Sequence, residues 1–169
     1  MNTRSYVPYL RNCFWFVVPV LLFNVLFARS LPPAYQASNF WRDIPRGISV
    51  PENALRVLVM SVPVLMPVAG TGAKARSVGF ACYGVGLALY FASWLALILY
   101  PDSTWSTHAP GFMGPAWTPI VWLVGIALIN DGTLAVPLRF FSRPLFLSGS
   151  VLFLLFHNLH VAFVFVRQR

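Results

Sequence analysis

The segment from Val78 to Tyr100, VGFACYGVGLALYFASWLALILY, contains no charged residue and constrains the fold more than any other feature. A helix needs about 20 consecutive apolar residues to cross a hydrocarbon core of about 30 Å. Lipid offers no partner for backbone polar groups, so a run of this kind must form its hydrogen bonds internally. We therefore predict a membrane-spanning helix here.

Four further apolar segments approach the same length and predict a bundle of five transmembrane helices. Hydrophobic residues make up 58% of the 169 residues and charged residues only 9%, whereas soluble domains have about 25% charged residues. The sequence thus predicts an all-α integral membrane protein, multi-pass, with a single domain over 1–169. The predicted spans are about 10–28, 51–69, 78–100, 112–129 and 144–166.

Prolines interrupt three of the predicted spans. Pro19 lies in the first span, Pro63 and Pro67 lie in the second, and Pro119 lies in the fourth. Each removes a backbone donor and bends its helix, which frees a carbonyl that needs another partner. We predict proline-kinked helices that can leave cavities between them, although proline is common in transmembrane helices generally.

An odd number of spans places the 29–50 linker, the 101–111 linker and the C-terminus on one membrane face, which we call face A. The N-terminus and the remaining linkers fall on the opposite face, face B. Each face carries six Lys or Arg residues. The positive-inside rule gives most weight to short loops and the first helix, and the 101–111 linker has no basic residue. Face B, with the N-terminus, is therefore predicted to be cytoplasmic.

Acidic side chains are scarce and gather on face A. The four acids are Asp43, Glu52 and Asp102 on face A and Asp131 on face B. In SVPENALR, Ser49 is spaced to cap the second span with a returning bond from Glu52, and Arg56 is spaced to pair with Glu52. Arg56 also lies about one turn inside the span, where a charge needs an anion or a route to the surface. Glu52 is predicted either to serve the cap and ion pair or to face a functional cavity.

All three histidines fall in the half of the membrane next to face A. His157 and His160, in FHNLHV, lie three residues apart on one face of the fifth span, and His108 lies in the 101–111 linker. Metal sites use such ligands, but familiar zinc motifs space helical histidines at four with a nearby Glu, and we predict no metal and no cofactor. Two interpretations remain: neutral histidines bonded to neighbouring helices, or histidines that contact a ligand or transfer protons.

Aromatic residues make up 16% of the chain, and several are predicted near face A. They are Trp41, Tyr100, Trp105 and Trp117. Their position is typical of an interfacial belt. The same residues could also line a pocket for a flat apolar ligand or a cation.

Small residues recur every four positions along the third span, at Gly84, Ala88, Ala92 and Ala96. Helices in lipid associate closely where side chains are small. This row predicts that the third helix is central in the bundle, or that it docks onto a second copy or a partner helix.

Several function classes are excluded by what the sequence lacks. The only lysine, Lys74, lies in a turn, so no retinal Schiff base can form within a span. No carboxylate lies in the middle of a predicted span, where proton-coupled transport would place one. The net charge of +8 is spread over loops and helix ends, without the basic fold that nucleic-acid binding needs.

In length and number of spans the chain resembles the tryptophan-rich sensory (translocator) proteins, small bundles that bind porphyrins and sterols. Their Trp and Pro cluster belongs near the second helix, whereas GPAWTPIVW opens the fourth span here. The resemblance therefore implies an architecture and transfers no residue roles.

The leading hypothesis is a membrane protein that binds an apolar or amphipathic small molecule, such as a lipid, sterol or terpenoid, in a cavity that opens to face A. Its expected lining residues are Asn24, Glu52, Arg56, Trp105, His108, His157 and His160. A second hypothesis is a membrane-embedded isomerase or cyclase acting on a lipid-like substrate, in which Glu52 or Asp102 donates a proton and His157 accepts one. A third is an accessory subunit of a membrane complex that docks through the small-residue row.

Overall fold

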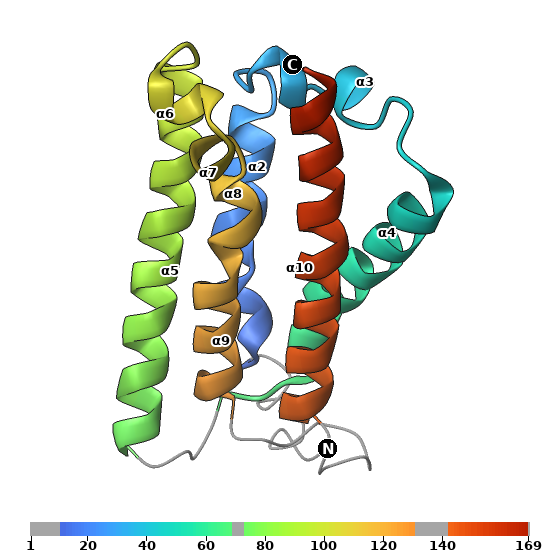
Figure 1. The fold of residues 1–169 in the computed structure, drawn as a ribbon. Helices are drawn as coiled ribbons and strands as arrows, with labels where there is room; N and C mark the ends of the chain where they lie inside the picture. The colour runs from blue at the N-terminus through green and yellow to red at the C-terminus, as the bar shows by residue number, and fades with distance from the viewer. Residues whose placement is uncertain (1–10, 69–72, 131–141, 169) are drawn as a thin grey trace.

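The computed structural model of the chain describes residues 11–68, 73–130 and 142–168 (Figure 1). In this part of the chain the longer helices are α2 (Val18–Phe27), α4 (Arg46–Ser61), α5 (Ala73–Leu99), α9 (Pro119–Ile129) and α10 (Ser142–Arg167). Shorter helical turns connect or extend them: η2 (Cys13–Phe16), η3 (Pro33–Tyr35), α3 (Ala37–Phe40), η4 (Val62–Leu65), α6 (Thr104–Thr107), α7 (Ala109–Phe112) and α8 (Gly114–Trp117). The described residues thus form a helical bundle.

Three helical stretches in the described residues are long and apolar enough to cross a membrane: Arg46–Leu65, Ala75–Leu99 and Arg143–Arg167. Cys13–Phe27 and Gly114–Ile129 are apolar but shorter. Large apolar side chains such as Val25 and Val57 are exposed on the outer surface, which water would not favour over so many positions. These features indicate a membrane protein, while a bundle of five spans stays a prediction.

Successive helices run in opposite directions along the bundle (Figure 1). The segments that connect α2 to α4 and α5 to α9 lie at its upper end in that view, together with the end of α10. These are the segments that the sequence assigns to face A. The cytoplasmic position of the N-terminus stays a prediction, and residues 1–10 lie outside the described residues, as does Asp131.

Three of the four prolines that interrupt the predicted spans lie at junctions between helical segments. Pro19 lies in the first turn of α2, just after η2, and Pro63 lies in the first turn of η4. Pro119 begins α9 directly after α8. Proline is tolerated in a first turn because its missing N–H would have no partner within the helix there. The predicted interruptions therefore occur as changes of helical segment.

The predicted cap at Ser49 is wrong. α4 begins at Arg46 after Pro45, and no side chain caps it. Ser49 therefore lies within the first turn of the helix, and Pro51 lies inside it. The carboxylate of Glu52 has other partners, described below.

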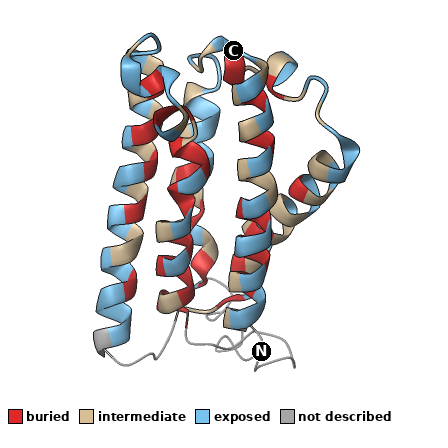
Figure 2. Cartoon of the chain, viewed as in Figure 1, coloured by how far each residue is buried: buried red, intermediate tan, exposed pale blue. Residues whose placement is uncertain are grey.

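The prediction that the third span is central is also wrong. α5 lies at one edge of the bundle, with one side exposed along its length (Figure 2). Gly84, Ala88 and Ala92 are on that exposed side. A docking role for this row of small residues stays a prediction.

A different row of small residues brings α5 against α9. A Cβ placed on Gly86 of α5 would lie 2.3 Å from the backbone nitrogen of Trp122, and one on Gly125 of α9 would lie 2.5 Å from that of Tyr83. Gly79, seven residues before Gly86, also lies close to α9: a Cβ placed on it would lie 3.0 Å from the backbone nitrogen of Ile129. The two helices pack backbone to backbone at these positions, as small residues permit in lipid.

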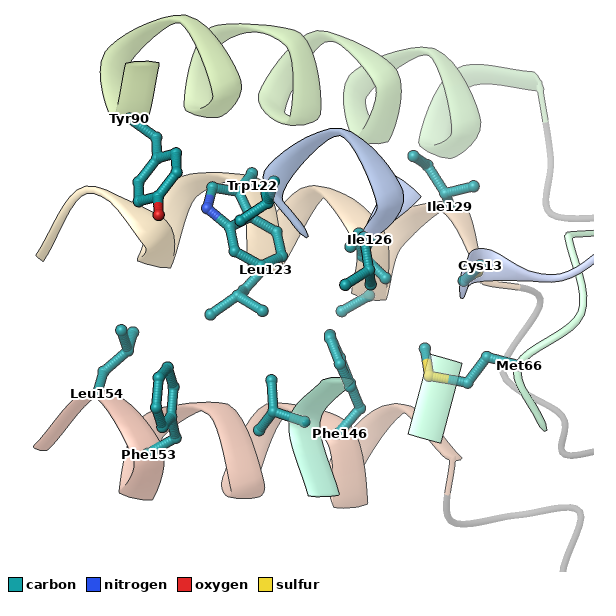
Figure 3. Packing of buried hydrophobic residues seen from close by; sticks show 14 residues of the cluster. Cys13, Met66, Tyr90, Trp122, Leu123, Ile126, Ile129, Phe146, Phe153 and Leu154 are labelled. Carbon is teal, nitrogen blue, oxygen red and sulfur yellow. The ribbon is translucent and has the colours of Figure 1, made fainter. Parts of the chain in front are cut away.

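The main core lies between α9, α10 and the start of the chain that the structure describes (Figure 3). Trp122 and Ile126 of α9 face Phe146 and Phe153 of α10, and all four are almost fully buried. At the lower end the N–H of Cys13 donates to the carbonyl of Met66 at 2.8 Å, which ties η2 to the end of η4.

Candidate functional site

The carboxylate of Glu52 lies at the centre of a cluster of four ionisable residues, with its side chain fully buried. Its Oε1 lies 2.8 Å from Nδ1 of His157 and its Oε2 lies 2.5 Å from Nδ1 of His160. The guanidinium of Arg56 pairs with Oε1. We call Glu52, Arg56, His157 and His160 the Glu52 cluster.

Helix geometry explains how the sequence builds this cluster. Glu52 and Arg56 are four residues apart and lie on the same face of α4. His157 and His160 are three residues apart and share a face of α10. Since α4 packs across α10 (Figure 1), these two faces meet. The i, i+4 pair that the sequence predicts for Glu52 and Arg56 is confirmed.

His160 also binds the segment that precedes α4. Its Nε2 lies 2.9 Å from the carbonyl oxygen of Phe40, and its ring stacks on the Phe40 ring at 4.1 Å between centroids. Trp41 packs edge-on against the other side at 4.6 Å. From the end of α10, Arg167 donates to the carbonyl oxygens of Asn39 and Arg42. The 39–42 segment therefore covers the cluster and is held at two points.

The hydrogen bonds of His160 fix the protons of the cluster. A carbonyl oxygen only accepts, so Nε2 of His160 must carry a proton. Exactly one further proton can then lie between Nδ1 and Oε2 of Glu52. Whichever atom holds it, Glu52 and His160 together have no net charge. Arg56 is always protonated and adds one positive charge.

A cavity of about 300 Å³ adjoins the cluster. Arg56 and His157 form part of its wall, and most of the remainder is aromatic. The aromatic lining residues are Phe23, Phe27, Tyr35, Phe40, Trp41, Tyr90, Trp94, Trp122 and Phe153. This volume is at the lower end of the range of about 300–1,000 Å³ that is typical of small-molecule sites.

The aromatic wall holds Arg56 in place. Its guanidinium carbon lies 5.3 Å from the ring centroid of Trp41 and 5.9 Å from that of Phe153. Phe153 also stacks on His157, with the ring planes 9° apart. Contacts of this kind stabilise a cation over an aromatic face. Arg56 and His157 are therefore positioned by packing against these rings as well as by their bonds to Glu52.

The indole N–H of Trp122 is a buried donor in a residue that lines the cavity. Trp122 is 1% exposed, and its indole N–H makes no hydrogen bond within the described residues. Figure 3 shows this nitrogen on the edge of the ring nearer Tyr90, whose hydroxyl donates to Oδ1 of Asn24 at 2.8 Å. A buried polar group without a partner costs about 1–3 kcal/mol, and this nitrogen is itself buried from the cavity.

The remaining predicted site residues lie in different places. Asn24 lines the cavity. Trp105 is 51% exposed on α6, and His108 is exposed with its Nδ1 2.6 Å from the carbonyl oxygen of Thr104. Asp102 is exposed and lines a second cavity of about 600 Å³. None of the last three lines the cavity beside the Glu52 cluster.

Sequence reasoning missed most of the aromatic lining of the cavity. Tyr35 is an example: its hydroxyl donates to the carbonyl oxygen of Phe112 at 2.5 Å, and its ring lines the cavity. Burial raises the pKa of Tyr35 above its usual value, so the hydroxyl stays a donor. A tyrosine in a proline-rich linker carries no periodic pattern that could have predicted this position.

Within the described residues no group of three or more His, Cys, Asp and Glu side chains is arranged to hold a metal ion. In the Glu52 cluster both Nδ1 atoms point at carboxylate oxygens, so their lone pairs do not converge on a shared point. The cluster is instead a hydrogen-bonded wall of the cavity. The chain matches no family model, no curated protein and no solved structure.

Proposed function

We propose that the protein binds a small apolar or amphipathic molecule in the cavity beside the Glu52 cluster. The single observation that carries this proposal is the cavity itself, an aromatic chamber with Arg56 and His157 at one wall. Ligand sites are typically mostly apolar with a few convergent polar groups.

The expected route into the cavity lies beside α2. Leu21 and Asn24 both line the cavity and are exposed, so the cavity opens next to this helix. The neighbouring Leu22 and Val25 are also exposed, which makes that surface suitable for contact with lipid tails. A ligand dissolved in the leaflet next to face A could therefore enter sideways, without crossing water.

Filling the cavity should weaken binding. Ala116 is 1% exposed and lines the cavity, so Ala116→Leu would place extra methyl groups where the ligand lies. We expect the affinity for ω-bromoundecanol to fall about tenfold or more, since one extra carbon in a fitted pocket changes binding about 10- to 200-fold. Bromine quenches nearby indoles, and Trp41, Trp94 and Trp122 line the cavity, so quenching of tryptophan fluorescence measures the affinity.

Ala92→Leu is the matched control because it makes the same change on the exposed side of α5. It should bind the probe as the unmodified protein does. Equal quenching of all three proteins would mean that the probe quenches only from the detergent or lipid, and the proposed function would be wrong.

A second candidate function is acid/base catalysis on a lipid-like substrate, and the bond between Glu52 and His157 favours it. His157 lines the cavity while its Nδ1 is held by the carboxylate. A carboxylate that orients an imidazole in this way prepares the other ring nitrogen to accept a proton. In this candidate His157 is the base and Glu52 positions it. Glu52 itself is paired on both oxygens and is poorly placed to be the acid.

A further inference from the structure

The charge of the Glu52 cluster does not balance. Glu52 and His160 share one proton and cancel, which leaves Arg56 with a positive charge beside the cavity. His157 can donate from Nδ1 to Glu52 while neutral, so it adds no negative charge. The cavity wall therefore carries at least one uncompensated positive charge.

No other acid in the described residues can neutralise it. The Asp43 carboxylate is 81% exposed and lies near Arg42. Asp102 is exposed and lines the other cavity, and the fourth acid, Asp131, lies outside the described residues. A charge on an apolar helix is costly without a partner, and Arg56 is only one-third exposed along its side chain. Arg56 pairs with Glu52, but His160 already offsets the charge of that carboxylate. An anion in the cavity would balance the remaining positive charge.

The polar groups that reach the cavity are also mainly donors. Arg56 has further N–H groups beyond those that bind Glu52 and Asn53. His157 makes no bond from Nε2 that the structure describes, and this nitrogen becomes a donor when the ring takes up a proton. Donors with excess positive charge select ligands that are acceptors with negative charge.

We propose that the natural ligand is an apolar carboxylic acid, bound as its carboxylate with the head group at Arg56 and His157 and the apolar body among the aromatic rings. The cavity of about 300 Å³ is too small for a two-chain phospholipid and fits one short chain or a compact ring system. A single guanidinium matches a single negative charge. This inference rests on the proposed function, because it names the chemical class of the molecule that the cavity binds.

A series of probes that differ only in the head group tests the inference. Binding of ω-bromoundecanoic acid, ω-bromoundecanol, ω-bromoundecylamine and ω-bromoundecyl phosphate is measured by quenching of tryptophan fluorescence in the purified full-length protein, with the Ala116→Leu signal subtracted. The acid should bind at least tenfold more tightly than the alcohol, the amine should bind most weakly, and the phosphate should bind no more tightly than the acid.

Arg56→Gln should reduce the affinity for the acid about tenfold and leave that for the alcohol unchanged. Arg46→Gln, at the exposed start of α4, is the matched control and should keep the preference. Arg56→Lys retains the charge and should retain most of the preference. If Arg56→Gln does not fold, the probe series on the unmodified protein still decides the matter.

The outcomes separate the two proposals. Equal affinity for acid and alcohol, or tighter binding of the amine, would overturn the carboxylate assignment while the proposed function stood. Tighter binding of the phosphate than of the acid would overturn it in favour of a doubly charged head group. No specific quenching by any probe would overturn both.

Discussion

Glu52→Ala is expected to destabilise the protein by about 3–5 kcal/mol, the range for removing one partner of a buried ion pair. The substitution leaves Arg56 without its carboxylate and removes the acceptor of both histidine Nδ1 atoms. It also disconnects α4 from α10, because these bonds join the two helices. The free energy of unfolding can be measured by titrating the protein from mild micelles into dodecyl sulfate while tryptophan fluorescence is followed.

Glu52→Gln should cost less than Glu52→Ala. The amide oxygen can still accept from Arg56 and His157, and the amide NH₂ can donate to Nδ1 of a neutral His160. The bond from Nε2 of His160 to the Phe40 carbonyl would persist in this arrangement. What is lost is the negative charge beside Arg56. The order of stability should therefore be the unmodified protein, then Glu52→Gln, then Glu52→Ala.

Asp102→Asn is the control for a change of acid at the same end of the bundle. Asp102 is exposed, and surface substitutions usually stay within about 0.5 kcal/mol. If Glu52→Ala unfolds at the same detergent fraction as Asp102→Asn, the bonds of the Glu52 cluster do not hold α4 against α10.

The sequence allowed local features of the site to be predicted. Spacings of three and four along one helix are sufficient to place His157 with His160 and Glu52 with Arg56. The meeting of these two pairs depends on how α4 crosses α10, which no spacing within either helix determines. For this reason the sequence leaves open whether Glu52 belongs to a helix cap and ion pair or faces a cavity. The bonds to both histidines place it beside the cavity.

The missed cap has a local cause. The S-x-x-E pattern at Ser49 is a typical signal for the N-terminus of a helix. Proline is also favoured at the start of a helix, and Pro45 provides this second signal. The helix therefore begins one turn earlier and includes Pro51. Pro51 lies inside this helix and cannot make the hydrogen bond to the carbonyl of Gly47.

The linkers were the least predictable part of the site. The segment with Trp105 and His108 lies at the upper end of the bundle in Figure 1. Both side chains are exposed there and do not line the cavity. The aromatic side chains that do line the cavity from a linker are Tyr35, Phe40 and Trp41, which lie in short segments without a periodic pattern. Aromatic content alone predicts a belt or a pocket equally well.

The small residues of α5 show why periodicity can mislead. The row at Gly84, Ala88 and Ala92 has a spacing of four and lies on the exposed side. Gly79 and Gly86 are seven apart and meet α9. Both spacings follow one side of a helix, so the sequence offers two candidate faces, and only the position of α9 decides between them.

Gly86→Ala tests that choice and should destabilise the protein by about 1–3 kcal/mol, the usual cost of overpacking a tight contact. Its new Cβ would lie 2.3 Å from a backbone nitrogen of α9. Backbone cannot rotate away as a side chain can, so α5 and α9 must separate.

Gly84→Ala is the matched control two residues earlier. A Cβ there meets nothing within 4 Å, and replacing a helical glycine with alanine should stabilise by about 0.5–1 kcal/mol. The same dodecyl sulfate titration measures both. Loss of stability at Gly84 with none at Gly86 would mean that the row at Gly84 is the packed face, and that α5 meets a partner there.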